Sequence, residues 1–254
     1  MAARGFLGAG DLYIARYNST LAAFEAYKGP YEATKFEIKP NVELKELSSR
    51  GRSTYGQVIE SVPLAQPAEF TVELPEVNRE SLTIALLGTA SAISQGAGSI
   101  ADEVVVAALD GWVRLTKENI TVAGLAVKHT TGNPVYVLNT DYEVNYRLGM
   151  IKAKVGGAIV DAQSLKASFA YTAVAGTAIA GATNAQIRAK FLLDGKNFAD
   201  DLPVQVEIWE AIIAADTAFD FLSNDFATVS MPGRLKTPVG KTEPFVVRLL
   251  NAAI

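Results

Sequence analysis

The amino-acid sequence predicts a mainly β fold: a sandwich or barrel with one short flanking α-helix, two long hairpins and a small inserted β domain. Two long stretches, 33–74 and 186–213, alternate apolar and polar residues. This period of two places one face of a strand against a core and the other in water. Between the two stretches, turn residues recur about every 8–12 residues, which is typical of a small β-sandwich.

The stretch 33–74 is the longest strand pattern. Its apolar positions are Phe36, Ile38, Val42 and Leu44 on the first arm, and Phe70, Val72 and Leu74 on the second. Each arm is about 15 residues long, well beyond the common strand length of about 5–6. Pro40, Pro63 and Pro67 predict bulges, bends or edges, because proline cannot donate to a ladder. One subunit of this size cannot cover such a hairpin, so we interpret it as an assembly element.

The clearest helix follows this hairpin. Asn78 is a candidate N-cap, Glu80 and Ser81 lie in the first turn, and Gly88 is a natural stop. The sequence therefore predicts an amphipathic helix of about three turns.

Small residues dominate three other segments. Residues 1–10 are expected to form a flexible arm, 89–99 a linker, and 172–185 a smooth surface or a closely packed turn. A first strand is expected over 11–17.

The domain organisation is expected to be discontinuous. One domain comprises 1–108 and 176–254, and 109–175 forms the inserted domain, whose strand-like pieces are 120–129, 134–139, 141–155 and 164–173.

The second hairpin, 186–213, turns near 196–202. Closing strands are expected at 219–222, 227–231 and 245–250.

Composition excludes several classes of function. The 254 residues carry a formal net charge of −4 without a cluster of basic residues, which disfavours tight duplex binding. With no cysteine, neither disulfides nor thiolate metal sites are possible. We expect no membrane span and no signal peptide, and hence a protein made in the cytoplasm.

No catalytic, cofactor or metal site is expected, and the chain is interpreted as not an enzyme. Gly240-Lys241-Thr242 lacks the earlier glycine of a phosphate loop, and His129 is the only histidine. The Asp194-Gly195-Lys196-Asn197 segment lacks the final acidic ligand of a calcium loop. Carboxylates without a pocket signature are Asp200, Asp201, Asp216, Asp220 and Asp225.

Four segments in order resemble the major tail tube protein of tailed bacteriophages with long, non-contractile tails, the siphovirus type. They are KFEIKPNVELKELSSRGRSTYGQVIESV, LPEVNRESLTIALLG, KFLLDGKNFADDLPVQVEIWEA and FDFLSNDFATVSMPGRL. The resemblance covers roughly 1–108 and 176–254.

This resemblance implies a homohexameric ring to which each subunit gives two hairpins that line an inner barrel. Rings would stack into a hollow tube of the virion, through which DNA passes during ejection. Other implied partners are the tape measure protein in the lumen and the tail terminator and distal tail proteins, with no membrane. The N-terminal arm, Ala2 to Gly10, would cross an interface. The implied ring-stacking loop is Ser48, Ser49, Arg50, Gly51, Arg52, Ser53, Thr54, Tyr55 and Gly56.

An acidic lumen wall would repel phosphates and let DNA slide. The candidate lumen residues are Glu37, Glu43, Glu60, Glu69, Glu73, Lys190 and Glu207. Several basic residues alternate with them, so which hairpin face lines the lumen stays open, because a one-residue slip inverts the assignment.

Two alternatives stay open. One is a β-sandwich module that binds or hydrolyses carbohydrate, and the other is a tube ring of a contractile tail or a secretion system. The inserted domain is expected to decorate the outside of the tube.

Overall fold

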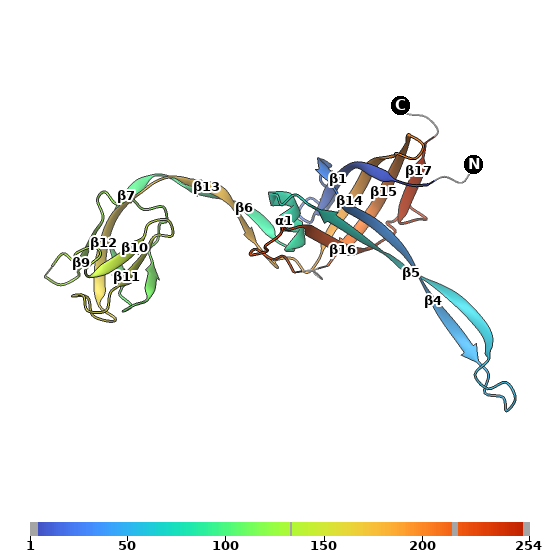
Figure 1. Ribbon diagram of the computed structural model, residues 1–254, viewed down its shortest axis with the longest axis horizontal. Coiled ribbons are helices and arrows are strands. Elements are labelled where there is room, and N and C mark those ends of the chain that lie inside the picture. The colour runs from blue at the N-terminus through green and yellow to red at the C-terminus, as the bar shows by residue number, and fades with distance from the viewer. Residues whose placement is uncertain (1–4, 133, 215–217, 251–254) are drawn as a thin grey trace. The chain divides into compact units, whose positions relative to one another are not determined.

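The computed structural model describes residues 5–132, 134–214 and 218–250, and these are mainly β (Figure 1). The chain divides into two compact units, which we call unit 1 (residues 1–90 and 179–254) and unit 2 (residues 91–178). The first boundary lies earlier than the expected residue 109. The reason is that β7 (Gly98–Val106) pairs along β12 (Ser164–Tyr171), so this strand belongs to unit 2.

Unit 1 is built on one nine-stranded sheet. Its path runs β2-β1-β14-β15-β16-β5-β4, with β3 paired to β1 and β17 paired to β15. The strands are β1 (Gly8–Asn18), β2 (Ala23–Phe24), β3 (Lys28–Glu32), β4 (Lys35–Ser48), β5 (Val58–Leu74), β14 (Ile187–Asn197), β15 (Leu202–Ile213), β16 (Val229–Leu235) and β17 (Phe245–Leu249). Both long hairpins, β4–β5 and β14–β15, form as expected, with antiparallel register.

The core of unit 1 is formed by the buried residues of these strands. The rings of Phe70 on β5 and Phe191 on β14 lie 5.0 Å apart between centroids, so strands far apart in the sheet meet across the core. On β5, every second residue is buried from Ala68 to Leu74, as the period of two predicts.

The predicted helix is α1 (Arg79–Ala85), the one helix among the described residues. Asn78 caps it, since its side chain accepts the Ser81 amide and the Ser81 hydroxyl accepts the Asn78 amide. The helix is shorter than the expected three turns. It ends because Leu87 adopts a positive φ of 47°, and the Gly88 amide donates to the Thr83 carbonyl at 2.8 Å.

The first ten residues are not all a flexible arm. Gly8, Ala9 and Gly10 belong to β1 and pair with Asn197, Lys196 and Gly195 of β14, while residues 2–4 of the expected interface arm lie outside the described residues. A Cβ on Gly10 would lie 2.5 Å from the Asp194 carbonyl oxygen. Close strand approach therefore explains this glycine.

Unit 2 contains two three-stranded sheets around its own core. One sheet is β7-β12-β9 and the other is β10-β11-β8, with β8 (Trp112–Arg114), β9 (Ala126–His129), β10 (Tyr142–Asn145) and β11 (Met150–Ala153). The core is formed by side chains such as Leu165, Phe169 and Ile151. The expected strand at 134–139 is not formed; only isolated bridges occur there.

The expected linker at 89–99 and the expected smooth surface or closely packed turn at 172–185 each contain a strand instead. β6 (Thr89–Gln95) and β13 (Val174–Ala180) pair with each other, so the chain enters and leaves unit 2 along this two-stranded ribbon. The expected closing strands exist as β16 and β17, but 219–222 is a loop.

Candidate assembly interface

The distal part of the first hairpin, which we call the arm (residues 41–66), is covered by no other described part of the chain. Every residue of Val42–Ser48 and Val58–Pro67 is exposed, whereas β5 becomes buried only from Ala68 onward. β4 is the last strand of its sheet, and β16 pairs only with Glu69–Leu74 of β5. Both faces and both edges of the arm are therefore available, and Figure 1 shows β4 and β5 running out together.

One face of the arm continues the apolar face of the core. On β4, Phe36 and Ile38 pack against the core, and Val42 and Leu44 follow on the same side at the same alternation. Val42 is 56% exposed and Leu44 is 59% exposed. Their partners across the ladder are Ala65 and Pro63. The hydrophobic face thus extends beyond the part of the core that this chain covers.

The prolines mark an irregularity, as predicted. The register shifts between Lys39 and Asn41, where Lys39 pairs with Glu69 but Asn41 pairs with Gln66. Two residues of β5, Pro67 and Ala68, therefore lie opposite the single residue Pro40 of β4. This arrangement of one residue against two is a β-bulge.

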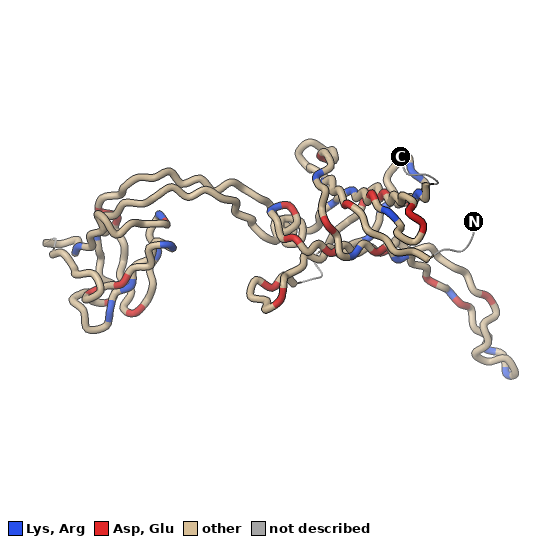
Figure 2. Tube along the Cα trace, turned by 45° about the horizontal axis from the view of Figure 1, so that its top comes forward, with Lys and Arg blue, Asp and Glu red and all other residues tan. Residues whose placement is uncertain are grey.

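The opposite face of the hairpin carries charge. The register places Glu37, Glu43, Glu60, Glu69 and Glu73 of the candidate lumen residues on this one face. Lys35, Lys39 and Lys45 share it. Lys35 Nζ lies 2.9 Å from a Glu37 oxygen, Lys39 Nζ lies 3.5 Å from Glu69, and Lys45 pairs with Glu43. Basic and acidic residues follow one another along the hairpin in Figure 2.

This pairing corrects the expectation of a predominantly acidic wall. With five glutamates and three lysines, the formal charge of this face is 3 − 5 = −2. A hydrogen bond from Lys35 to Glu37 is the main reason why the pKa of Lys35 lies above its usual value. The face is weakly acidic and largely neutralised.

The two remaining candidate lumen residues lie on the second hairpin. Lys190 and Glu207 are on the side of β14–β15 that faces away from the core. Lys190 Nζ lies 4.6 Å from the centroid of the Phe24 ring, and Arg248 donates to Glu207 at 3.3 Å. In the sheet order, β16 separates these strands from the first hairpin.

The tip loop, residues 48–57, has a defined internal structure. The Ser49 hydroxyl lies 2.7 Å from the Thr54 hydroxyl and accepts the Gly51 amide at 3.1 Å, and Ser49 is only 8% exposed. The Ser49 amide donates to the Gln57 carbonyl at 2.7 Å. Arg50, Arg52 and Tyr55 point outward on this frame and are exposed, Tyr55 at 79%. The tip therefore presents exposed basic and aromatic side chains on an internally hydrogen-bonded loop.

The second hairpin does not lack partners, contrary to the expectation that both hairpins find theirs on sister copies. β1 pairs along β14 from Gly8 to Arg16. β16 and β17 pair along the other edge of β15. Of the two hairpins, only the first leaves long stretches unpaired in the described structure.

The sequence did not reveal a buried carboxylate on β15. Glu210 is 2% exposed, and its Oε1 lies 2.6 Å from Arg188 Nε and 3.2 Å from Lys236 Nζ. Burial alone would raise the pKa of Glu210, but hydrogen bonds from both cations outweigh it and keep the pKa below its usual value. The register of β15 shifts opposite Ala189–Phe191, next to Glu210, so that Ala211 and Ile213 continue the core face after Ile208, and the alternation pattern gave no sign of this shift.

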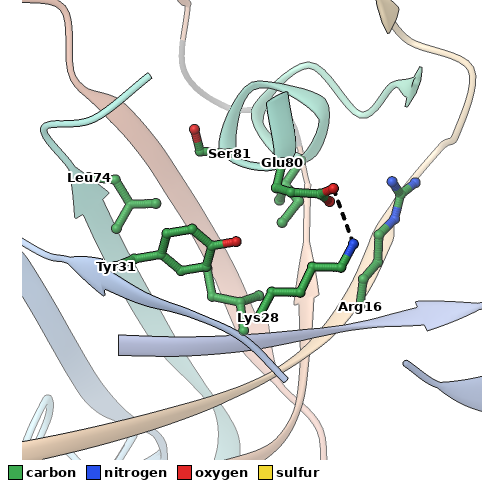
Figure 3. A pocket seen from close by; sticks show the side chains of 8 residues that line it. Arg16, Lys28, Tyr31, Leu74, Glu80 and Ser81 are labelled. Atoms are coloured by element: carbon green, nitrogen blue, oxygen red, sulfur yellow. Dashed lines mark ion pairs between the residues drawn. The ribbon is translucent and has the colours of Figure 1, made fainter. Parts of the chain in front are cut away.

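A small cavity lies beneath α1, lined by Arg16, Lys28, Tyr31, Leu74, Glu80 and Ser81 among others (Figure 3). Its volume of about 10 Å³ holds roughly one water molecule. Among its lining residues, Lys28 Nζ lies 3.1 Å from a carboxylate oxygen of Glu80. Burial raises the pKa of Glu80, yet hydrogen bonds from Arg79 and Lys28 bring it below the usual value. The contacts are those of a structural ion pair.

The other titratable candidates are not brought together. Asp220 and Asp225 lie on an exposed loop, and Asp216 lies outside the described residues. His129 Nδ1 accepts the Thr131 amide at 2.7 Å within its own turn. Among the described residues, no group of three or more His, Asp or Glu side chains could hold a metal ion.

The fold and its unpaired arm define a class: a mainly β protein with a hairpin arm that has no cover in its own chain. The chain belongs to the family described as "Protein of unknown function UCP028589", whose sequence model matches residues 5–241. No curated protein matches it. None of the helices in the described residues has the length and apolarity to cross a membrane.

Proposed function

We propose that this chain is the structural subunit of a phage tail tube of the siphovirus type. Copies form hexameric rings, the rings stack into a tube of the virion, and the lumen passes DNA during ejection. The tape measure protein occupies the lumen before ejection, and tail terminator and distal tail proteins close the ends. No chemistry is required of the subunit.

The observation that carries this proposal is the exposed arm. Val42, Leu44 and their cross-strand neighbours extend the core face into solvent, and long apolar ribbons with free edges are avoided in proteins that act as monomers. A second copy of the chain is the partner that is always present at the site of synthesis. Symmetric assembly from identical copies would cover both the edges and the apolar face.

The charged face of the hairpin supports the same function. Its lysines are already engaged by glutamates, so few cations are left to hold phosphates. A protein that binds duplex DNA needs a cluster of unpaired lysine and arginine side chains. A weakly acidic, self-neutralised face would let a duplex move past it.

Negative-stain electron microscopy and sedimentation velocity of the purified chain test this proposal. Rings of six copies and hollow tubes are expected, together with no binding of duplex DNA at low salt. A sample that stays monomeric at high concentration would refute the tube and favour a module that binds carbohydrate. The proposal also predicts that removing the arm prevents assembly. A chain in which residues 42–65 are replaced by a short turn should fold but stay monomeric.

A further inference from the structure

An aromatic and acidic loop, residues 218–228, lies between β15 and β16 and has no cover in the described structure. Phe221 is 68% exposed, Leu222 is 90% exposed and Phe226 is fully exposed. Phe219 packs against the core and holds the Phe221 ring 4.7 Å away, centroid to centroid. The loop is thus anchored by one aromatic ring and presents three large apolar side chains outward.

The loop is also ordered by two local hydrogen bonds between side chains and the backbone. The Asp220 carboxylate accepts the Leu222 amide at 2.8 Å, and the Asp225 amide donates to the Ser223 hydroxyl at 3.2 Å. Within 218–228, Asp220 and Asp225 are the charged residues, so the formal charge is −2. Exposed phenylalanines combined with one sign of charge are typical of a contact surface.

The tip loop of the arm is the complement of this surface. Arg50 and Arg52 give residues 48–57 a formal charge of +2 without any acidic residue. Tyr55 is exposed beside them, and the aliphatic Leu47 and Val58 flank the loop, 58% and 51% exposed. Guanidinium groups bind carboxylates through paired hydrogen bonds and stack on aromatic rings. The two loops therefore match in charge and in apolar character.

The register places the two loops at opposite ends of β5. The tip loop precedes Val58, the first residue of that strand. Val229, which follows the aromatic loop, pairs with Leu74, the last residue of the strand. A strand of 17 residues spans about 55 Å. One chain cannot bring its own two loops together, whereas the tip of one copy can reach the base of the next.

We propose, on the basis of the proposed tube function, that the tip loop of each copy docks on the aromatic loop of the copy in the next ring. Arg50 and Arg52 pair with Asp220 and Asp225, and Tyr55 packs against Phe221 and Phe226. A contact between different surfaces of identical copies either closes into a ring or repeats without end, and between stacked rings it repeats along the tube. It therefore sets the direction in which rings stack.

Charge reversal tests this contact. Arg50→Glu with Arg52→Glu, and separately Asp220→Lys with Asp225→Lys, should each raise the concentration needed for tubes at least tenfold and leave rings intact. Combining the four substitutions should restore tubes. The matched control, Lys128→Glu with Arg147→Glu, reverses two charges in unit 2 and should change nothing. Thermal melts establish that each variant is folded.

A cysteine crosslink gives a second readout that does not depend on charge. Because the chain has no cysteine, Tyr55→Cys with Phe226→Cys introduces the sole thiols. Oxidised tubes of this variant should yield a ladder of linked chains longer than dimers, and each single variant should give dimers at most. If both charge-reversal variants form tubes at the wild-type concentration and the cysteine variant gives no ladder, the proposed contact is wrong and the proposed function still stands. A wild-type chain that stays monomeric would overturn both.

Discussion

Replacing Val42 and Leu44 with alanine separates assembly from folding. The two substitutions remove five carbons, worth at most about 4 kcal/mol if fully buried at about 0.8 kcal/mol each. Since these side chains are 56% and 59% exposed in the single chain, a covering copy would gain about 2 kcal/mol from the surface still available. That loss corresponds to roughly 30-fold weaker association at each contact.

The stability of the single chain should hardly change. Substitutions at exposed positions usually alter the free energy of unfolding by less than about 0.5 kcal/mol. Phe70→Ala on the same hairpin provides the contrast, because its side chain is 2% exposed and packs against Phe191. Its loss should cost about 3–5 kcal/mol of folding stability.

Urea titration measures the free energy of unfolding, and sedimentation velocity measures the association constant. A matched control is Val122→Ala with Val155→Ala, which shortens two exposed valines of unit 2, 65% and 71% exposed. This control should leave both quantities unchanged. The reasoning is refuted if the double alanine variant of the arm unfolds more easily by about 2 kcal/mol or more while association stays at the wild-type value.

Three further predictions follow from the described contacts. Ser49→Ala removes the hydroxyl that is hydrogen-bonded to the Thr54 hydroxyl and the Gly51 amide. Hydrogen exchange of the Gly51 amide should accelerate, and tubes should become shorter while rings persist. An unchanged exchange rate would contradict this prediction. The pKa of Glu210 is held low in the folded chain, so its carboxylate contributes stability that is present above its unfolded pKa of about 4.3 and is lost as the pH falls through the folded pKa. Urea titrations at a series of pH values should therefore show that the free energy of unfolding falls less steeply toward acid pH in Glu210→Gln than in the wild type. An equally steep fall in both proteins would contradict this. Because the two units have separate cores, replacing residues 91–178 by a short linker should leave the melting temperature of unit 1 unchanged in calorimetry and should leave rings visible by microscopy. Aggregation of the shortened chain would show that unit 2 is needed.

Strong local patterns predicted the two hairpins and the cap of α1. The alternation that includes Phe36, Ile38, Phe70 and Val72 was readable because these residues fill one core. The capping residue Asn78 acts within four residues of chain, so its role did not depend on distant partners.

Long-range pairing decided what the sequence left open. The strands of 89–95 and 174–180 consist mostly of small residues with weak strand preference, and each depends on a partner about 80 residues away. The aromatic segment 219–222 alternates like a strand, but it is a loop with no ladder partner. The face of each charged residue on the hairpins followed only from the register, which a bulge changes by one residue.

The prolines within the arm and at its base have a consequence for accuracy in polymerisation. Pro40, Pro63 and Pro67 supply no amide hydrogen, so the exposed ribbon is interrupted as a template for hydrogen bonding. An unrelated strand that drifts onto it can form only a broken ladder, whereas a sister copy also satisfies its apolar stripe. The ribbon thus resists fibril-like growth with unrelated strands and can still bind other copies of the same chain.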